Sequence, residues 1–247
     1  MGRCTTRVRH LLFCVEILGL RNYYSMGLAM STDSGETSEL LRRAGQGDQQ
    51  AVGELFSRHQ ERLRRMVQLR LDRRLRGRLD ASDVLQEAFL EFSRSLAEYL
   101  HNPSIPFFLW LRCVTGRKLH ALHRKHLGAQ VRDAGREVSL HHGALPEASS
   151  VSLAAQLLGR HTSPSQAAVR AELQIRIQEA LNAMDPIDRE VLALRHFEQL
   201  TNGETAQTLG LSEAAASNRF VRALKRLKKI LLSLPGLLDE PPDAVTE

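Results

Sequence analysis

Apolar residues recur at the spacing of an amphipathic helix in four segments of the N-terminal half. These segments span residues 39–45, 49–70, 80–99 and 106–126. In the second segment, one apolar stripe consists of Val52, Leu55, Phe56, Leu63, Met66 and Val67. The pattern predicts four helices that share a small apolar core.

The periodicity is lost over residues 129–163, where Gly, Ser, His and Pro gather, as in HHGALPEASS. Such a composition is typical of a linker. A second helical block follows, and the chain ends in the proline-rich, acidic run PGLLDEPPDAVTE, which is typical of a disordered tail. We therefore predict an all-α fold with two small helical domains, over 37–128 and 164–234, joined by a flexible linker over 129–163. The predicted tail is 235–247.

Residues 1–36 are predicted to be an N-terminal extension, either disordered or produced from an upstream start codon. Its apolar run, Leu11 to Leu20, is interrupted by Glu16 and is shorter than the roughly 20 apolar residues that span a membrane. Arginines precede this run, as in a signal peptide, but no small-residue cleavage site follows it. Met26 or Met30 could be the true start. We expect no membrane insertion.

Composition supports a helical, basic protein. Hydrophobic residues make up 43% of the 247 residues and aromatic residues only 5%, while the net charge is +6. Arginine outnumbers lysine, and its planar guanidinium suits contacts with phosphates and base edges. Cys4, Cys14 and Cys113 fit no zinc or disulfide spacing, so a reducing cytoplasm is expected.

The clearest motif is a helix-turn-helix over residues 201–232. Thr201 and Glu204 form a capping box, Gly210 suits the left-handed end of the first helix, and Ser212 can cap the second. The inward positions of the second helix are Ala216, Phe220, Ala223, Leu224 and Leu227, and its basic outer positions are Arg219, Arg222, Lys225, Arg226, Lys228 and Lys229. The motif predicts DNA binding, and an ordinary helical hairpin with a solvated basic face is the alternative.

Two further helices precede this motif. One spans 165–184, and the other begins at Asp185, a capping residue followed by Pro186 at the first helical position. Together they predict a four-helix module that ends in the recognition helix.

An acidic ridge is predicted on the helix 80–99, where Asp83, Glu87 and Glu91 recur at four-residue spacing. Like charges at this spacing are mildly destabilising, so the ridge is either a solvated face or a docking surface for a basic partner. The preceding segment, 56–79, has nine arginines and two acidic residues. That density suits a phosphate track or an acidic protein partner.

The helix 106–126 combines aromatic residues with cations. Phe107, Phe108 and Trp110 could stack on unpaired bases or belong to the core, and the core is the better interpretation for Trp110. Its three histidines, His120, His123 and His126, share a face without a carboxylate or cysteine at ligand spacing, so no metal site is predicted.

The order of these motifs resembles the bacterial RNA polymerase sigma factors of the extracytoplasmic-function type. An arginine-rich helix precedes DVLQEAFLEF, then FFLWLRCVTGRKLHALHRKH and a linker, and finally ALNAMDPIDREVLALRHFEQLTNGETAQTLGLS and a basic helix. The resemblance covers residues 37–127 and 164–232. It identifies the two domains as counterparts of conserved regions two and four of that family.

The resemblance implies a role for each site. The positions that match the core-docking motif for the β′ coiled coil are Asp83, Gln86 and Glu87. The candidates for contact with the melted −10 promoter element are Arg117, Lys118, His120 and Arg124, together with the loop 101–106. The candidates for reading the −35 element as a duplex are Ser217, Asn218, Arg219 and Arg222. The second domain is also expected to touch the β flap of the polymerase.

One departure from the family concerns the run that opens the recognition helix, where residues 214–216 are alanines. Asn218 could pair with adenine and an alanine could meet a thymine methyl group, so this run leaves the −35 sequence undetermined.

An anti-sigma factor is an expected further partner.

Two other functions are alternatives to a sigma factor. A helix-turn-helix transcription regulator would bind DNA without acting as a polymerase subunit, and it would carry an upstream ligand or receiver domain that the first block does not resemble. A nucleic-acid enzyme would need paired catalytic carboxylates, a P-loop or a metal cluster, and the sequence has none of these motifs. We therefore expect no catalytic residues and no cofactor.

Overall fold

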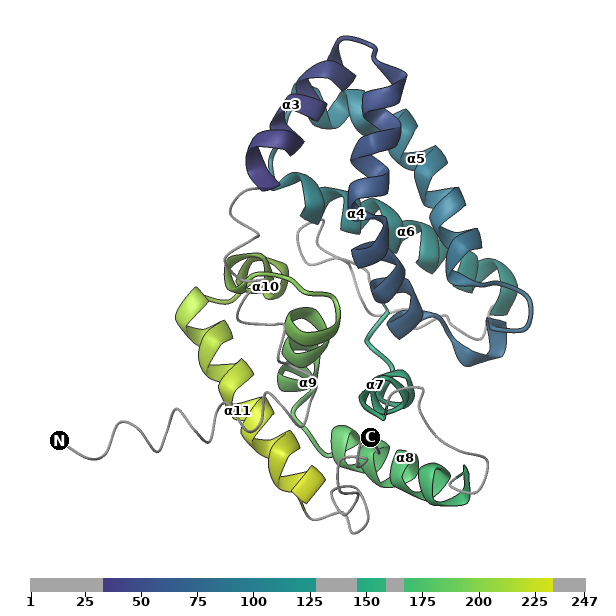
Figure 1. Cartoon of the computed structure of the whole chain (residues 1–247), viewed down its shortest axis with the longest axis vertical. Helices are drawn as coiled ribbons and strands as arrows, with labels where there is room; N and C mark the ends of the chain where they lie inside the picture. Colours follow the sequence, from purple (N-terminus) through teal and green to yellow (C-terminus); the bar gives the residue numbers. More distant parts are fainter. Residues whose placement is uncertain (1–32, 128–145, 159–166, 233–247) are drawn as a thin grey trace, which may run out of the picture. The chain divides into compact units, whose positions relative to one another are not determined.

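The computed structural model describes residues 33–127, 146–158 and 167–232, and every regular element within these ranges is a helix (Figure 1). The all-α fold predicted from the sequence is confirmed. The chain divides into two compact units, with the boundary between Leu55 and Phe56. No helix in the described ranges is both long and apolar enough to cross a membrane.

The first unit contains helix α3 (Asp33–Gly45) and the first turns of α4 (Gln49–Arg70). Asp48 connects them, because its Oδ1 accepts the backbone N–H groups of Gln50 and Ala51 at 2.9 and 3.1 Å. Its other oxygen, Oδ2, lies 2.7 Å from Nη2 of Arg43, and this hydrogen bond lowers the pKa of Asp48. The carboxylate thereby caps α4 and fixes the turn that precedes it.

In the second unit, the remainder of α4 is followed by a short 3₁₀ turn η2 (Arg73–Leu75), α5 (Ala81–His101) and α6 (Phe107–Leu127). The predicted bounds of α4 agree with the structure, and those of α5 and α6 differ by two residues or fewer. Leu63 and Met66 of α4, Phe92 of α5, and Leu111 and Leu119 of α6 are almost completely buried. The helical spacing of the apolar residues therefore located this core correctly.

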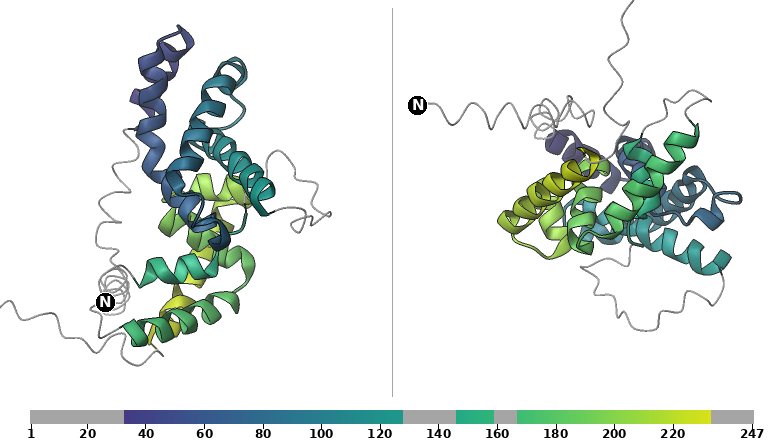
Figure 2. Two further views of the ribbon diagram at one scale, coloured as in Figure 1. Left: turned by 90° about the vertical axis from the view of Figure 1, so that its right-hand side faces the viewer. Right: turned by 90° about the horizontal axis from the view of Figure 1, so that it is seen from below.

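Helix α7 (Ser150–Leu157) lies inside the segment that the sequence analysis treats as an aperiodic linker. Its Leu153 and Ala154 are completely buried, and the Ser149 N–H donates to the carbonyl of Leu69 at 3.1 Å. Helices α7 and α8 (Ala167–Asn182) lie side by side (Figures 1 and 2). An eight-residue helix is too short to show two full repeats of an apolar stripe, which explains why periodicity did not reveal it.

The last part of the unit consists of α9 (Pro186–Leu192), a π-helical turn η5 (Ala193–Phe197), α10 (Asn202–Leu209) and α11 (Glu213–Leu232). The predicted capping box of Thr201 and Glu204 is present, and Gly210 ends α10 in the left-handed conformation at φ 63°. Ser212 caps α11 by accepting the N–H of Ala215 at 3.2 Å. The helix-turn-helix predicted from the sequence is therefore confirmed in its helices and in its turn chemistry.

A buried ionic cluster joins α4 and α6 to the end of η5. Arg70 donates to the carboxylates of Glu190 and Glu198, and Nε of Arg112 donates to Glu198 at 2.8 Å. Arg70 and Arg112 are each 3% exposed and Glu198 is 1% exposed. Burial alone would lower the pKa of Arg70, but the two carboxylates raise it. Arg70 therefore remains charged although it is buried.

Most residues of the predicted N-terminal extension and linker, and the whole predicted tail, lie outside the described ranges. This applies to Leu11–Leu20, Met26, Met30 and the pair His141–His142. The domain boundaries at these segments stay predictions.

Candidate nucleic-acid interface

The acidic face of α5 carries three polar residues that are close together and exposed. Asp83, Gln86 and Glu87 lie within two helical turns, all in contact with solvent. Asp83 also has a local structural role, because the Asp80 N–H donates to its Oδ2 at 2.8 Å while Asp80 accepts the N–H of Asp83 at 3.0 Å. This reciprocal pair is a capping box for α5. The sequence predicts Asp80 as the cap of α5, and the structure shows in addition that Asp83 completes the capping box.

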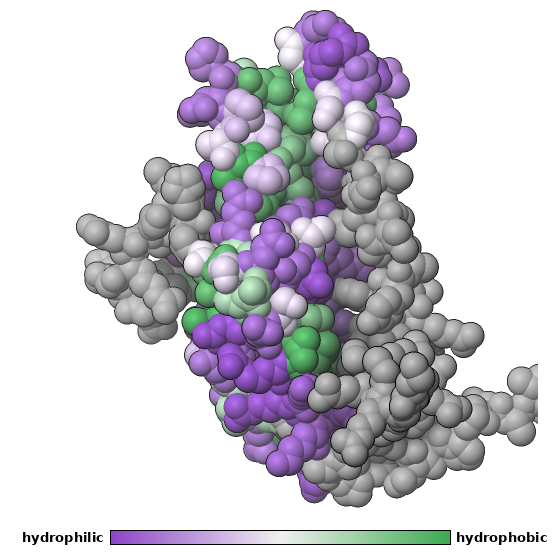
Figure 3. Space-filling view, turned by 90° about the vertical axis from the view of Figure 1, so that its left-hand side faces the viewer, coloured by the Kyte–Doolittle hydropathy of each residue, from purple (hydrophilic) through white to green (hydrophobic). Residues whose placement is uncertain are grey.

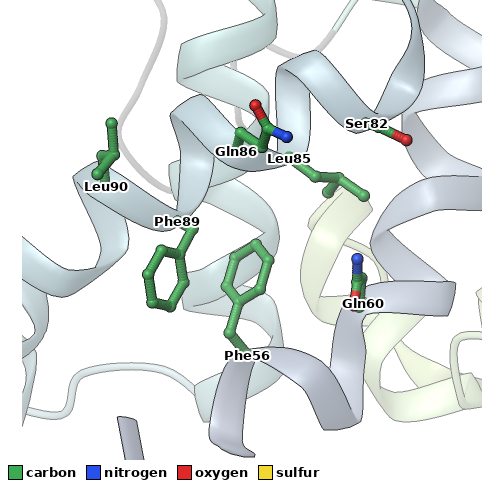
Figure 4. Close-up of a pocket in the computed structure, with 7 residues that line it drawn as sticks. All are labelled: Phe56, Gln60, Ser82, Leu85, Gln86, Phe89 and Leu90. Atoms are coloured by element: carbon green, nitrogen blue, oxygen red, sulfur yellow. The ribbon is translucent and has the colours of Figure 1, made fainter. Parts of the chain in front are cut away.

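A shallow hollow of about 490 Å³ adjoins this face (Figure 4). Its lining residues are Phe56, Gln60, Ser82, Leu85, Gln86, Phe89 and Leu90. Phe56 and Phe89 meet edge to face with ring centroids 5.2 Å apart, and Leu90 is 51% exposed. An exposed leucine next to polar side chains gives this part of α5 the mixture of apolar and acidic groups that is typical of a protein docking surface.

The four α6 residues predicted to contact DNA differ in their surroundings. Arg117 and Arg124 are exposed, and His120 is partly exposed on the same face. Lys118 is engaged, with Nζ 2.8 Å from Oε2 of Glu87 on α5. The hydrogen bond from Lys118 is the main reason that the pKa of Glu87 lies below its usual value.

The aromatic residues at the start of α6 belong mainly to the core. Phe107 and Phe108 are both 6% exposed, and the ring of Trp110 stacks on Tyr99 at 4.5 Å. The guanidinium carbon of Arg62 lies 3.5 Å from the centre of the Phe108 ring, a cation–π contact. Because these rings already have partners, the structure favours the core interpretation over stacking on bases.

The three histidines of α6 differ in their surroundings, because His123 is buried whereas His120 and His126 are partly exposed. His123 is buried, its Nε2 accepts the N–H of Asp72 at 3.3 Å, and burial lowers its pKa. Within the described part of the chain, no group of three His, Cys, Asp or Glu side chains is arranged to hold a metal ion. His123 instead anchors the turn that follows α4.

Helix α11 presents the residues predicted to read duplex DNA. Ser217 and Asn218 are exposed, whereas Arg219 and Arg222 both donate to Asp188 at the start of α9. Arg219 Nη1 also lies 3.5 Å from Oδ1 of Asp185. Arg219 Nη1 donates to Asp188 Oδ1 at 2.7 Å. Arg222 donates to the same carboxylate through Nε and Nη2, each at 3.0 Å. Hydrophilic side chains cover most of the lower described region in Figure 3, where α11 lies.

Asp188 is the functional candidate that the sequence analysis missed. Its side chain is only 7% exposed, and its pKa is lowered by the hydrogen bond from Arg222 and further by Arg219, against the opposing effect of burial. The sequence places it three residues after the cap Asp185, where an acidic residue is ordinary at a helix start. No local signal indicates that it pairs with arginines more than 30 residues later.

Known proteins are similar in sequence to this chain, both in its last helical block and over most of its length. Residues 174–227 match the family described as Sigma-70, region 4. The chain is 30% identical over 194 residues to the RNA polymerase sigma factor CarQ of Myxococcus xanthus, an alignment that covers 77% of this chain and 95% of CarQ. It is 29% identical over 216 residues to the ECF RNA polymerase sigma factor SigD of Mycobacterium tuberculosis, covering 87% of this chain and 91% of SigD.

Among solved structures, CnrH in complex with the cytosolic domain of CnrY is similar, with a TM-score of 0.46 and 24% identity. That match covers 79% of this chain and 97% of CnrH.

Proposed function

Because the chain belongs to the RNA polymerase sigma factors of the extracytoplasmic-function type, we propose that it binds core RNA polymerase, recognises the −10 and −35 promoter elements and starts transcription. The observation that carries this proposal is the similarity to CarQ over 95% of that protein, which includes both helical blocks. A helix-turn-helix regulator that acts without polymerase would share only the last block with these relatives. The comparisons therefore favour the sigma factor over that alternative.

Docking on core polymerase is assigned to Asp83, Gln86 and Glu87, with the β′ coiled coil as the expected partner. Their exposure on one stretch of α5 supports this assignment, as does the apolar hollow beside Gln86. A basic coiled coil could pair with the carboxylates while its apolar side chains cover Leu90. Such a mixed surface gains affinity from apolar burial and specificity from charge.

Contact with the −10 element is assigned to Arg117, Lys118, His120 and Arg124 of α6, together with the loop 101–106 that precedes this helix. Arg117 and Arg124 are exposed, and a basic helix face can follow the phosphates of a melted strand. Since Lys118 is paired with Glu87, the proposal requires that this ion pair opens or that Lys118 contributes less than its neighbours.

Reading of the −35 element is assigned to Ser217, Asn218, Arg219 and Arg222 of α11. The confirmed helix-turn-helix supports this, because the second helix of such a motif enters the major groove with its N-terminal residues at the base edges. The same module is expected to contact the β flap.

The polymerase supplies the chemistry of RNA synthesis, so this chain needs neither catalytic residues nor a cofactor. It would act in the cytoplasm, where the polymerase and DNA are. A protein that masks the exposed DNA-contacting residues, an anti-sigma factor, fits the same scheme as a negative regulator.

Run-off transcription with core polymerase tests the proposed function. A transcript that requires both the chain and the core enzyme supports it. Tight promoter binding by the chain alone, with no transcript after core is added, would establish the regulator instead.

A further inference from the structure

One buried carboxylate, Asp188, accepts hydrogen bonds from both arginines that are candidates for base recognition, and Arg219 also lies 3.5 Å from Asp185. Asp188 lies in the first turn of α9, and its own N–H donates to Asp185 Oδ1 at 3.3 Å. Arg219 and Arg222 lie one turn apart on α11, and both donate hydrogen bonds to Asp188. They follow it in the sequence by 31 and 34 residues. The helix-turn-helix core holds α9 against α11 through Val191, Ala216 and Ala223, each at most 1% exposed. The carboxylate therefore has a fixed position relative to the recognition helix.

The three partners differ sharply in exposure. The side chain of Asp188 is 7% exposed and that of Arg219 26%, whereas that of Arg222 is 60% exposed. An ordinary surface ion pair has two mobile, solvated partners and contributes little to stability. Here the acid is buried, whereas most of the Arg222 side chain is exposed to solvent. This arrangement holds the Nε and Nη2 edge of the Arg222 guanidinium and leaves the rest of the group accessible to solvent.

The hydrogen bonds also fix the orientation of the Arg222 fork. Nε and Nη2 form one edge of the planar guanidinium, and both bind Asp188 at 3.0 Å. A guanidinium carries five N–H donors in a rigid plane, so the edge that includes Nη1 keeps donors for a second acceptor. Guanine O6 and N7 accept such a pair of parallel hydrogen bonds in the major groove.

We propose that Asp188 is a positioning residue for −35 recognition, which holds the guanidinium groups of Arg219 and Arg222 in the orientation that reads base edges. This inference rests on the proposed −35 role of the two arginines. A long arginine side chain loses conformational entropy when it binds, and a partner that orders it beforehand reduces this loss. An arginine without this partner would contact phosphates of any sequence equally well. Asp188 is therefore expected to set base preference more than overall DNA affinity.

The experiment is a base-preference measurement on the full chain with core RNA polymerase from the same bacterium. Templates with a randomised −35 region are transcribed, and the templates that yield RNA are sequenced. The Asp188→Asn variant keeps the size of the side chain but has one acceptor oxygen and no charge. Glu179→Gln, which removes an exposed carboxylate of the neighbouring helix α8, is the matched control.

Asp188→Asn should weaken the base preference by about fivefold or more at the positions that Arg219→Ala or Arg222→Ala also affects. Transcription from non-preferred sequences should persist, and Glu179→Gln should keep the wild-type preference. In a chain that already carries both alanine substitutions, Asp188→Asn should change nothing further. The double-substitution result separates positioning from general destabilisation, because a structural defect would add to the alanine effects.

An unchanged base preference in Asp188→Asn would overturn the inference. So would an equal loss of transcription at every −35 sequence together with a lower unfolding temperature, since that result assigns Asp188 a structural role alone. If the wild-type chain with core yields no transcript from any template, the proposed function itself fails, and this inference fails with it.

Discussion

Lys118 Nζ of α6 lies 2.8 Å from Glu87 Oε2 of α5. One of these residues is a candidate for DNA contact and the other for polymerase docking, so the two proposed surfaces share an ion pair. Polymerase docking at Glu87 and DNA contact by Lys118 would each compete with this ion pair. The two proposed activities of this region are thereby connected through a single contact.

The docking assignment predicts that Glu87→Arg lowers the affinity for core polymerase by tenfold or more, because the acidic group that meets a basic partner becomes repulsive. Binding of labelled protein to core, measured by fluorescence anisotropy, provides the affinity. Glu98→Arg is the matched control, since Glu98 is an exposed acid near the other end of α5. Equal affinities for the two variants would remove Glu87 from the docking surface. Asp83 is less suitable for this test, because its substitution would also break the capping box of α5.

The buried ionic cluster predicts a large stability cost for Glu198→Ala. The substitution leaves Arg70 and Arg112 charged and buried without the carboxylate that joins them, which costs about 3 to 5 kcal/mol in the free energy of unfolding. Urea unfolding followed by circular dichroism measures this change. Glu39→Ala removes the carboxylate of an exposed surface pair with Arg42 and should leave the free energy of unfolding almost unchanged. A cost for Glu198→Ala as small as for Glu39→Ala would contradict the cluster.

Partial burial of His196 predicts a loss of stability in mild acid. Desolvation lowers its pKa from 6.5 to about 4 in the folded chain. Between these two values the unfolded chain binds the proton and the folded chain does not, so the free energy of unfolding decreases as the pH falls from 6.5 to 4. The contribution amounts to about 3 kcal/mol over this window.

The His196→Gln variant cannot take up this proton and should show a flatter pH dependence than the wild type. Urea unfolding at several pH values gives both curves. A residual slope is expected in the variant, because burial also lowers the pKa of His123. Parallel curves for the two proteins would show that His196 titrates normally in the folded state.

Much of the fold could be predicted from local signals. The stripe of apolar residues defined α4, and the caps Asp80, Thr201 and Asp185 marked where three other helices begin. Gly210 marked the turn of the helix-turn-helix because its φ of 63° is unfavourable for other residues. Each of these signals depends on residues within a few positions of one another, so the sequence displays them directly.

The remaining features depend on residues that are distant in the chain. Arg70 and Glu198 are 128 residues apart, and the charge of Arg70 in the sequence indicates a solvated residue although it is buried. The pairing of Asp188 with Arg222 is similarly invisible, since both residues fit ordinary positions on their own helices. The candidate site was therefore predicted as a set of exposed side chains, and the structure adds which of them are already paired.

The central claim, that the chain directs core RNA polymerase to promoters, is tested most directly by run-off transcription from a pool of randomised promoter templates. The chain alone, core alone and the two together are compared under the same conditions. The account predicts transcripts only in the combined reaction, from templates that share a −35 and a −10 motif at a fixed spacing. Absence of transcripts from the combined reaction, with sequence-specific DNA binding by the chain alone, would contradict it.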